Sequence, residues 1–122
     1  SLLKQLTTVG KVTREEFEVC FDQLNTNIYV IEIDGCIIAS GTLLIEQKFI
    51  HNLSSVGHIE DIVVDVAYRG KKLGRKIVQH LINVAYDNQC YKVILNCENN
   101  LENFYEKLGF HKKNIEMSKY FT

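Results

Sequence analysis

Hydrophobic and polar positions along the chain follow two different periods, which predict helices and strands in turn. Near the N-terminus, one helix face is formed by four apolar residues: Phe17, Cys20, Phe21 and Leu24. Thr13 and Glu16 have the spacing of a capping box at the start of this helix. The first helix is therefore expected to begin near Val12 and to end before the polar residues 25–27.

Two apolar runs joined by a two-residue turn predict a β-hairpin. The runs cover residues 28–33 and 36–46, and Asp34 with Gly35 forms the turn signal between them. Gly41 interrupts the second run and suggests a bulge there. The polar residues 47–57 that follow are expected to form a loop.

The next apolar run, residues 58–66, contains two adjacent carboxylates, Glu60 and Asp61. Strict alternation of side chains along a strand cannot expose both of them and also keep Ile59 and Ile62 inside. A bulge or a splayed register near Glu60 and Asp61 is the simplest solution, and bulges are frequent next to active sites because they re-aim a side chain.

A basic turn containing two glycines precedes the longest helix. Residues 69–76 hold five cationic side chains, and an amphipathic helix is predicted from there to about Asn88. Its buried stripe is expected to be Ile77, Val78, Leu81, Ile82, Val84 and Ala85. Three elements are expected after it: a strand over 91–97, a short helix over 101–108 ended by Gly109, and one or two strands over 110–121. This order predicts one α+β domain over residues 1–122, on a mixed, mostly antiparallel sheet flanked by helices.

Composition excludes several classes of protein. The 14 Lys and Arg and 15 Asp and Glu give a formal net charge of −1, which argues against a nucleic-acid-binding domain. No apolar run approaches the roughly 18 residues that span a membrane. The cysteines, Cys20, Cys36, Cys90 and Cys97, lack the spacing of a metal site and lie among apolar neighbours. Reduced, buried thiols in a cytoplasmic protein without a bound metal are therefore expected.

The unit of strand, basic turn and helix is the main chemical signal. Backbone N–H groups at a helix start lack intrahelical partners, and the helix dipole strengthens their attraction for anions. Gly70 and Gly74 let the backbone approach a phosphate closely, although a solvated helix start has the same pattern. The turn matches neither GxxxxGK[ST] nor GxGxxG, so a nucleoside triphosphate or a dinucleotide is not expected.

Two motifs resemble those of the GNAT superfamily of acetyl-CoA-dependent N-acetyltransferases. Arg69 and Gly74 match the ends of its Q/R-x-x-G-x-G/A pattern, and residues 104–110 resemble a later motif. The resemblance implies the GNAT-type acyl-CoA N-acyltransferase fold. It also implies acetyl-CoA as co-substrate, with its pyrophosphate held by the backbone amides of the turn.

Further segments narrow the resemblance to the eukaryotic glucosamine 6-phosphate N-acetyltransferases: residues 6–10, 46–51, 57–62 and 90–92. This family implies acetyl transfer to the amine of D-glucosamine 6-phosphate by direct attack in a ternary complex, within UDP-N-acetylglucosamine biosynthesis. It also implies a homodimer with the C-terminal strand at the interface. The family opens with a strand before the first helix, and that strand is expected to be missing here because of a truncated or divergent start.

The resemblance implies catalytic roles for three residues. Glu60 is expected to act as the general base, directly or through water, and Asp61 to bind or orient the sugar. Tyr105 is expected to protonate the departing thiolate of CoA. Taken from the pattern alone, the carboxylates also fit an exposed strand edge, and Tyr105 also fits a core aromatic.

The resemblance also implies two sets of binding residues. The cofactor set is Ile62, Val63, Val64, Arg69, Gly70, Lys71, Lys72, Leu73, Gly74, Arg75 and Asn96. The substrate set is Thr7, Lys48, Phe49, Ile50, His51, Glu60, Asp61, Tyr91, Lys92 and Tyr120. The cations of the second set suit the phosphate of an amino sugar.

Four residues depart from the family pattern. Lys72 replaces the usual glycine of the turn, Asn96 a carboxylate, Leu101 an asparagine that contacts the pantetheine arm, and Tyr120 an arginine that reaches the substrate phosphate across the dimer interface. Catalysis is therefore expected to depend more heavily on Glu60 and Tyr105.

Two other functions stay compatible with the sequence. One is a GNAT enzyme for a different primary amine, such as a polyamine or a peptide, although a cationic acceptor would favour carboxylates at Lys48, His51 and Lys92. The other is a non-catalytic acyl-CoA-binding module, which Asn96 and Leu101 would permit.

Overall fold

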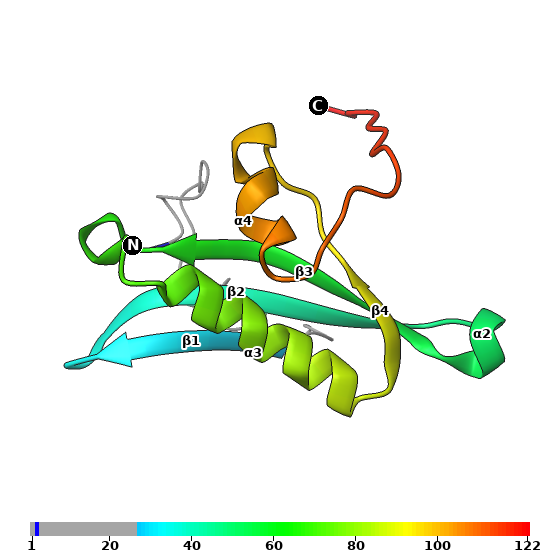
Figure 1. The fold of residues 1–122 in the computed structure, drawn as a ribbon, viewed down its shortest axis with the longest axis horizontal. Helices are drawn as coiled ribbons and strands as arrows, with labels where there is room; N and C mark the ends of the chain where they lie inside the picture. The colour runs from blue at the N-terminus through cyan, green and yellow to red at the C-terminus, as the bar shows by residue number, and fades with distance from the viewer. Residues whose placement is uncertain (1, 3–26) are drawn as a thin grey trace.

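The computed structural model describes Leu2 and residues 27–122, so Thr7 and the expected first helix lie outside the described residues. The described strands form one sheet in the order β1-β2-β3-β4 (Figure 1). They are β1 (Asn27–Ile33), β2 (Cys36–Gln47), β3 (Ser55–Val64) and β4 (Cys90–Ile94). The first three are antiparallel, and β4 is parallel to β3. The predicted mixed, mostly antiparallel sheet is confirmed.

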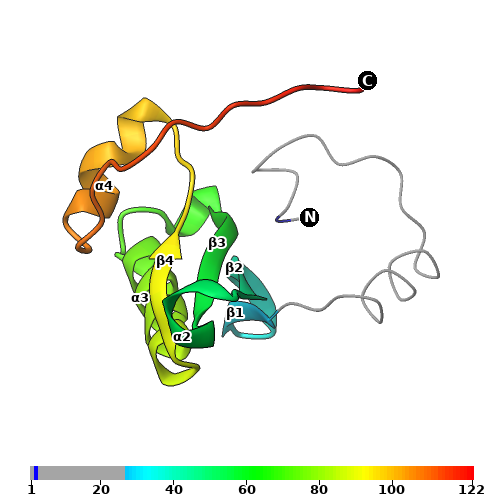
Figure 2. The same cartoon turned by 90° about the vertical axis from the view of Figure 1, so that its right-hand side faces the viewer.

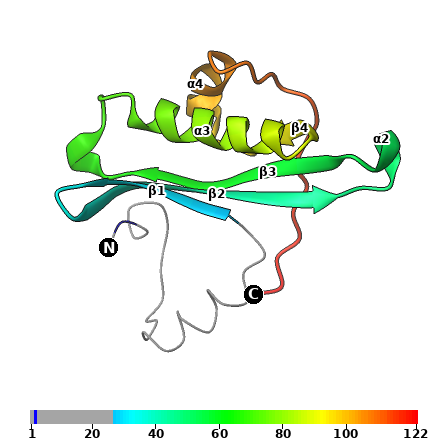
Figure 3. The same cartoon turned by 90° about the horizontal axis from the view of Figure 1, so that it is seen from below.

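Two helices, α3 (Leu73–Asp87) and α4 (Glu102–Glu106), lie on the same side of this sheet (Figure 3). Helix α3 follows the predicted basic turn and packs on the sheet through Leu73, Ile77, Val78, Leu81 and Ala85, which are buried. Ile82 and Val84, also expected in the stripe, are half-buried. Short turns complete the described elements: α2 (Ile50–Leu53) and the 3-10 turns Val66–Tyr68 and Asn99–Leu101.

The hairpin between β1 and β2 has the predicted two-residue turn. Asp34 has a φ of 50° and Gly35 a φ of 79°, so both turn residues are left-handed. This is the conformation that matches the twist of antiparallel strands, and it explains why Asp-Gly occupies the turn.

The predicted bulge at the acidic pair is present on β3. Thr42 pairs with Glu60 and Ser40 pairs with Val63, so Gly41 alone faces two residues of β3. Asp61 has a φ of 53°, and the alternation of side chains between the two faces of the sheet shifts by one residue at this point. Ile59 and Ile62 both pack with the core, while both carboxylates are exposed, as the alternation argument requires. The irregularity at Gly41 belongs to this bulge, with the extra residue on β3.

The close approach at Gly41 shows why the bulge suits this sheet. A Cβ atom at Gly41 would lie 2.6 Å from Cδ1 of Ile62 and 3.1 Å from Cδ1 of Leu81. The glycine therefore leaves the space into which the shifted Ile62 side chain packs beneath α3.

Helix α4 ends at Glu106, earlier than the predicted residue 108, and a turn follows that closes at the predicted Gly109. Gly109 has a φ of 96°, its N–H donates to the carbonyl of Glu106, and the N–H of Phe110 donates to the carbonyl of Tyr105. These two bonds form a Schellman motif, which satisfies carbonyl groups at the helix end.

Three expected boundaries differ from the structure. β3 begins at Ser55, because residues 55–57 pair with residues 45–47 and shorten the expected loop. β4 ends at Ile94 instead of residue 97, where its pairing with β3 stops. The strands expected over 110–121 are absent from the described residues (Figure 2), since no described strand lies beside this segment to pair with it.

The expectation of buried cysteines is wrong for the described ones. Cys36 and Cys97 are exposed and Cys90 is half-buried, all with free thiols. Cys36 directly follows the hairpin turn and Cys97 lies beyond the end of β4, so neither reaches the core. Cys20 lies outside the described residues.

Candidate active site

The outer edge of β3 is open along the part that carries the bulge. β4 pairs with β3 only over residues 55–58, and beyond that point the two separate (Figure 1). Residues 59–64 of β3 have no strand partner on this edge among the described strands. Backbone N–H and C=O groups need partners, so an extended ligand laid along this edge would find hydrogen bonds there.

The basic turn that follows β3 leads into a helix start suited to an anion. Asp65 accepts a hydrogen bond from the backbone N–H of Ala67 at 2.9 Å, which orders the first part of the turn. Gly70 and Lys72 have left-handed φ values of 87° and 61°. In the described part of the chain, no side chain caps α3 and its first turn holds no acidic residue. The free N–H groups and the dipole of this 15-residue helix therefore favour a phosphate.

The cations of the turn divide into two groups. Arg69 donates through Nε to the carbonyl of Val64 at 3.1 Å, and the Nζ of Lys71 lies 5.3 Å from the ring centre of Tyr68. Arg69 therefore holds the turn on β3, and Lys71 packs on a ring within the turn. The others line an open groove along α3, formed by Lys72, Arg75, Lys76, Gln79, His80 and Asn83. Lys76 was not in the predicted cofactor set.

Tyr105 lies in the core next to the start of α3. Its side chain is 8% exposed and makes edge-to-face contacts with the rings of Phe104 and Phe110. Phe104 in turn lies 3.5 Å from the position of a Cβ on Gly74, which holds α4 against the anion site. Burial, and secondarily the nearby Cys97, raise the pKa of the Tyr105 phenol. The phenol therefore keeps its proton at neutral pH and is available as a donor.

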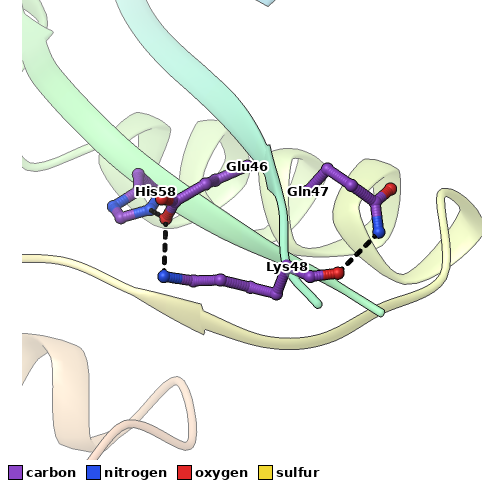
Figure 4. Close-up of polar contacts among 4 residues, drawn as sticks. All are labelled: Glu46, Gln47, Lys48 and His58. Carbon is purple, nitrogen blue, oxygen red and sulfur yellow. Dashed lines mark hydrogen bonds and ion pairs between the residues drawn. The ribbon is translucent and has the colours of Figure 1, made fainter. Parts of the chain in front are cut away.

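The sheet face opposite α3 carries a row of charged side chains. A Cβ on Gly57 would contact Ala85 of α3, so the alternating residues His58 and Glu60 point to the other face. Glu46 lies on this face as well, and Figure 4 shows it bound to His58 and Lys48, with α3 behind the strands. Its Oε1 lies 2.9 Å from Nε2 of His58 and 3.3 Å from Nζ of Lys48.

Lys92 joins this face from the neighbouring strand. In the parallel register Lys92 pairs with Val56 and Ile94 pairs with His58, so these side chains point to the same side. Lys48 and Lys92 are thereby placed at one end of the row and Glu60 at the other. The structure brings these predicted residues to one surface.

Four further predicted residues lie at the end of the sheet away from Glu60, three in the turn between β2 and β3 and Tyr91 on β4, where Nζ of Lys92 lies 5.6 Å from the centre of the Tyr91 ring. The rings of His51 and Tyr91 stack at 4.1 Å, and Tyr91 is the extra residue where the register between β3 and β4 shifts. Phe49 and Ile50 are 91% and 58% exposed at the tip. Five strand residues separate Ser55 from Glu60, a distance of about 17 Å. These four residues therefore do not meet Glu60 within the same chain.

Asn96 contacts the C-terminal segment. Its Nδ2 donates to Oε1 of Glu116, and Oγ of Ser118 donates to the other carboxylate oxygen at 3.1 Å. Tyr120, from the same segment, is 84% exposed and is not brought together with the other predicted residues in the described chain.

Neither Glu46 nor His58 is among the site residues predicted from the sequence. His58 lies two residues before Glu60, so the strand period already predicts a shared face. Its bond to Glu46 depends on the register between β2 and β3, which the sequence pattern did not define.

The described residues contain neither a cluster of metal ligands nor a membrane-spanning helix. Residues 27–122 and Leu2 contain no group of three His, Cys, Asp or Glu side chains that could hold a metal ion. None of the described helices has the length and apolar character needed to cross a membrane.

Comparisons with known proteins agree with this arrangement. Residues 4–110 match the model of the acetyltransferase (GNAT) family. The chain is 47% identical to glucosamine 6-phosphate N-acetyltransferase from Arabidopsis thaliana over 98% of its length and 85% of that protein. It is 42% identical to the enzyme of the same name from Candida albicans, over 94% of this chain and 81% of the other. The crystal structure of the Arabidopsis enzyme superposes with a TM-score of 0.95, covering 99% of this chain and 87% of that one. The chain therefore belongs to the acetyltransferase (GNAT) family, in its glucosamine 6-phosphate N-acetyltransferase branch.

Proposed function

We propose that this protein transfers the acetyl group of acetyl-CoA to the amine of D-glucosamine 6-phosphate by direct attack in a ternary complex. The product, N-acetyl-D-glucosamine 6-phosphate, would supply UDP-N-acetylglucosamine biosynthesis. The observation that carries this proposal is the charged row on the sheet face opposite α3. The candidate base Glu60 lies at one end of this row, and Lys48 and Lys92 lie at the other. This arrangement suits a substrate with an amine at one end and a phosphate at the other.

Acetyl-CoA fits along the open edge of β3. The pantetheine arm would follow residues 62–64, and the pyrophosphate would bind the N–H groups at the start of α3 beside Gly70 and Gly74. Lys72 and Arg75 in the groove along α3 would meet the remaining phosphate charge. Leu73 is buried and fixes the helix start, while Arg69 and Lys71 support the turn. Asn96 would lie on the opposite side of the gap between β3 and β4.

The chemical step needs a neutral amine, a stabilised carbonyl oxygen and a proton for the leaving thiolate. Glu60 takes the proton from the ammonium group, and the amine nitrogen then forms the C–N bond with the thioester carbon. A backbone N–H near Ile62 donates to the carbonyl oxygen as negative charge develops on it. As the C–S bond breaks, the phenol of Tyr105 gives its proton to sulfur. The amine nitrogen loses its second proton as the amide forms, and this proton, passed through water, restores the phenol.

The substrate would be held by groups around this centre. Asp61, exposed by the bulge, would orient the sugar hydroxyls, and Lys48 with Lys92 would bind the phosphate. Phe49, Ile50, His51, Tyr91 and Tyr120 would contribute from a second chain, because they do not meet Glu60 within one chain. Thr7 is also assigned to the substrate by resemblance.

We further propose that residues 1–122 form a single catalytic domain, that the enzyme is a cytoplasmic homodimer, and that the C-terminal segment contributes to its interface. The apolar residues of that segment are the main support: Ile115, Met117, Tyr120 and Phe121 are 84–91% exposed in one chain. Apolar side chains so fully exposed favour burial against a partner.

Turnover of glucosamine 6-phosphate compared with unphosphorylated glucosamine tests the function. Release of CoA thiol would be followed with both sugars, with spermidine and with a lysine peptide. We expect kcat/KM to be about 100-fold higher with the phosphorylated sugar, because two charge-assisted contacts to the phosphate contribute roughly 3 kcal/mol together. Equal rates with both sugars, or a preference for the polyamine or peptide, would overturn the assigned substrate. Thermal stabilisation by acetyl-CoA without turnover of any amine would indicate a binding module instead.

A further inference from the structure

The pair formed by Glu46 and His58 has no role in the proposed acetyl transfer, yet it lies next to the candidate base Glu60 on the same face of the sheet. His58 and Glu60 are two residues apart on β3 and share the face opposite α3, so their side chains begin about 7 Å apart. At this distance the two groups are in reach of each other directly or through one water molecule.

The bond to Glu46 defines which nitrogen of His58 carries a proton. A carboxylate only accepts hydrogen bonds, so the nitrogen 2.9 Å from it, Nε2, is the donor. In the neutral imidazole the lone pair is then on Nδ1, which is free of Glu46 and able to accept a proton. The hydrogen bonds from His58 and from Lys48 lower the pKa of Glu46, so this carboxylate stays charged and stabilises an imidazolium beside it.

The proposed reaction creates a need for such a group. The acceptor enters as an ammonium ion, and each turnover delivers one proton to Glu60 that must be removed before the next. Imidazole is the side chain whose ordinary titration lies between pH 5 and 8, so it accepts and releases a proton readily under these conditions.

We propose that the Glu46–His58 pair is a proton relay that carries the substrate proton from Glu60 to solvent. The inference rests on the proposed function and adds its proton path. An ammonium N–H bond breaks as an O–H bond forms on Glu60. This O–H bond then breaks as an N–H bond forms at Nδ1 of His58, and the imidazolium is held by Glu46. Water at the exposed side of the sheet takes the proton and returns His58 to its neutral form.

The charged groups that face His58 agree with this direction of transfer. From β2 and its following turn these are Glu46 and Lys48, from β3 Glu60, and from β4 Lys92. The carboxylates of Glu46 and Glu60 lie on either side of the imidazole. Nζ of Lys48 contacts the same oxygen of Glu46 as His58 does, and Lys92 pairs with Val56, two residues before His58. His58 itself is partly exposed, with 24% of its side chain accessible, so solvent reaches the relay.

The pH profile of kcat in the full-length protein tests the relay, with His58→Gln as the main variant. The wild type should lose activity as the pH falls, because protonated His58 cannot accept another proton. In His58→Gln this acid limb should disappear and kcat should fall at least tenfold at pH 7.5, with the KM for acetyl-CoA changed less than threefold. Imidazole in the buffer should restore a large part of the activity to His58→Ala. His111→Gln, on the exposed C-terminal segment, is the matched control and should keep the wild-type profile.

The carboxylate is tested by Glu46→Gln, which keeps a hydrogen-bond acceptor but removes the charge. Because the protonated imidazole then loses the charge beside it, kcat should fall several-fold, and by less than in His58→Gln. A His58→Gln enzyme with an unchanged profile would overturn the relay, as would a uniform loss at every pH that imidazole does not restore. If the protein instead acetylates another amine, the proposed substrate is wrong, and the relay is tested by the same pH profiles measured with that amine. Normal turnover of glucosamine 6-phosphate by His58→Gln would reject the relay and leave the proposed function intact.

Discussion

At the scale of single residues, the site depends on ordinary side chains placed in unequal environments. Tyr105 is buried among aromatic rings and its pKa is raised, whereas Glu60 is exposed on the surface of the sheet. The first is therefore suited to keep a proton until the thiolate forms, and the second can reach a solvated substrate. Each role predicts a different response to the smallest substitution that removes it.

Replacing Tyr105 by phenylalanine should mainly lower kcat. The ring still fills the space between Phe104 and Phe110, so only the hydroxyl is lost. We expect kcat to fall about 10- to 100-fold, with little change in the KM for acetyl-CoA. Steady-state kinetics with both substrates measures this, and Tyr86→Phe on the exposed face of α3 is the control. Full turnover by Tyr105→Phe would remove the phenol from the mechanism.

Replacing Glu60 by glutamine should lower turnover while leaving acetyl-CoA binding intact. The amide cannot accept a proton, so kcat should fall about 10²- to 10⁴-fold. Because Glu60 is exposed, the thermal midpoint should stay within a few degrees of the wild type. Calorimetric titration measures the binding of acetyl-CoA, and CoA-release kinetics measure turnover. Glu32→Gln on β1 is the control. Wild-type turnover in the variant would assign the proton to another acceptor.

At the scale of elements, the basic turn places a lysine in a conformation that glycine adopts more easily. Lys72 has a φ of 61° directly before α3, at the position where the family motif usually has glycine. A left-handed residue with a side chain costs roughly 1–2 kcal/mol, so the chain keeps the backbone geometry of the motif at the expense of stability. In return, a cation lines the groove along α3.

Lys72→Gly should therefore have opposite effects on stability and on cofactor binding. Relief of the left-handed strain, partly offset by the greater freedom of glycine in the unfolded chain, should raise the free energy of unfolding by about 0.5 kcal/mol. Loss of the cation should weaken acetyl-CoA binding several-fold. Urea denaturation and calorimetric titration measure the two effects. Lys71→Gly is the stability control and should give no gain, since Lys71 is not among the left-handed residues of the turn. A loss of stability in Lys72→Gly would contradict the strain argument.

The elements also show what the sequence could predict and why. The hydrophobic pattern required Ile59 and Ile62 to face the core together, and this condition alone was sufficient to predict the bulge at Glu60 and Asp61. The pairing of Glu46 with His58 was not predictable in the same way. It depends on the register across the turn between β2 and β3, where three consecutive left-handed residues, His51, Asn52 and Leu53, occupy a stretch with no glycine to signal them.

At the scale of the whole molecule, one chain leaves its C-terminal segment uncovered. One or two strands over residues 110–121 were predicted from the apolar character of this segment, but a strand also needs a neighbour, and one chain offers none among the described strands. The sequence pattern therefore identified the apolar side chains that favour burial, but it did not identify the surface against which they are buried. A second copy of the chain would provide both the hydrogen-bonding partner and the apolar surface.

The proposed dimer predicts that the wild type has twice the chain mass in light scattering at micromolar concentration. The double variant Met117→Asp, Phe121→Asp should shift the mass towards the monomer, because it would bury two charges at the apolar interface. If residues around His51 and Tyr91 reach Glu60 from a second chain, as proposed, the monomer should also lose most of its turnover of glucosamine 6-phosphate. Lys113→Asp changes charge in the same segment without removing an apolar side chain, so it should remain dimeric and active. A wild-type monomer with full activity would show that a single chain completes the site, and Lys48 with Lys92 would then be sufficient for the substrate phosphate.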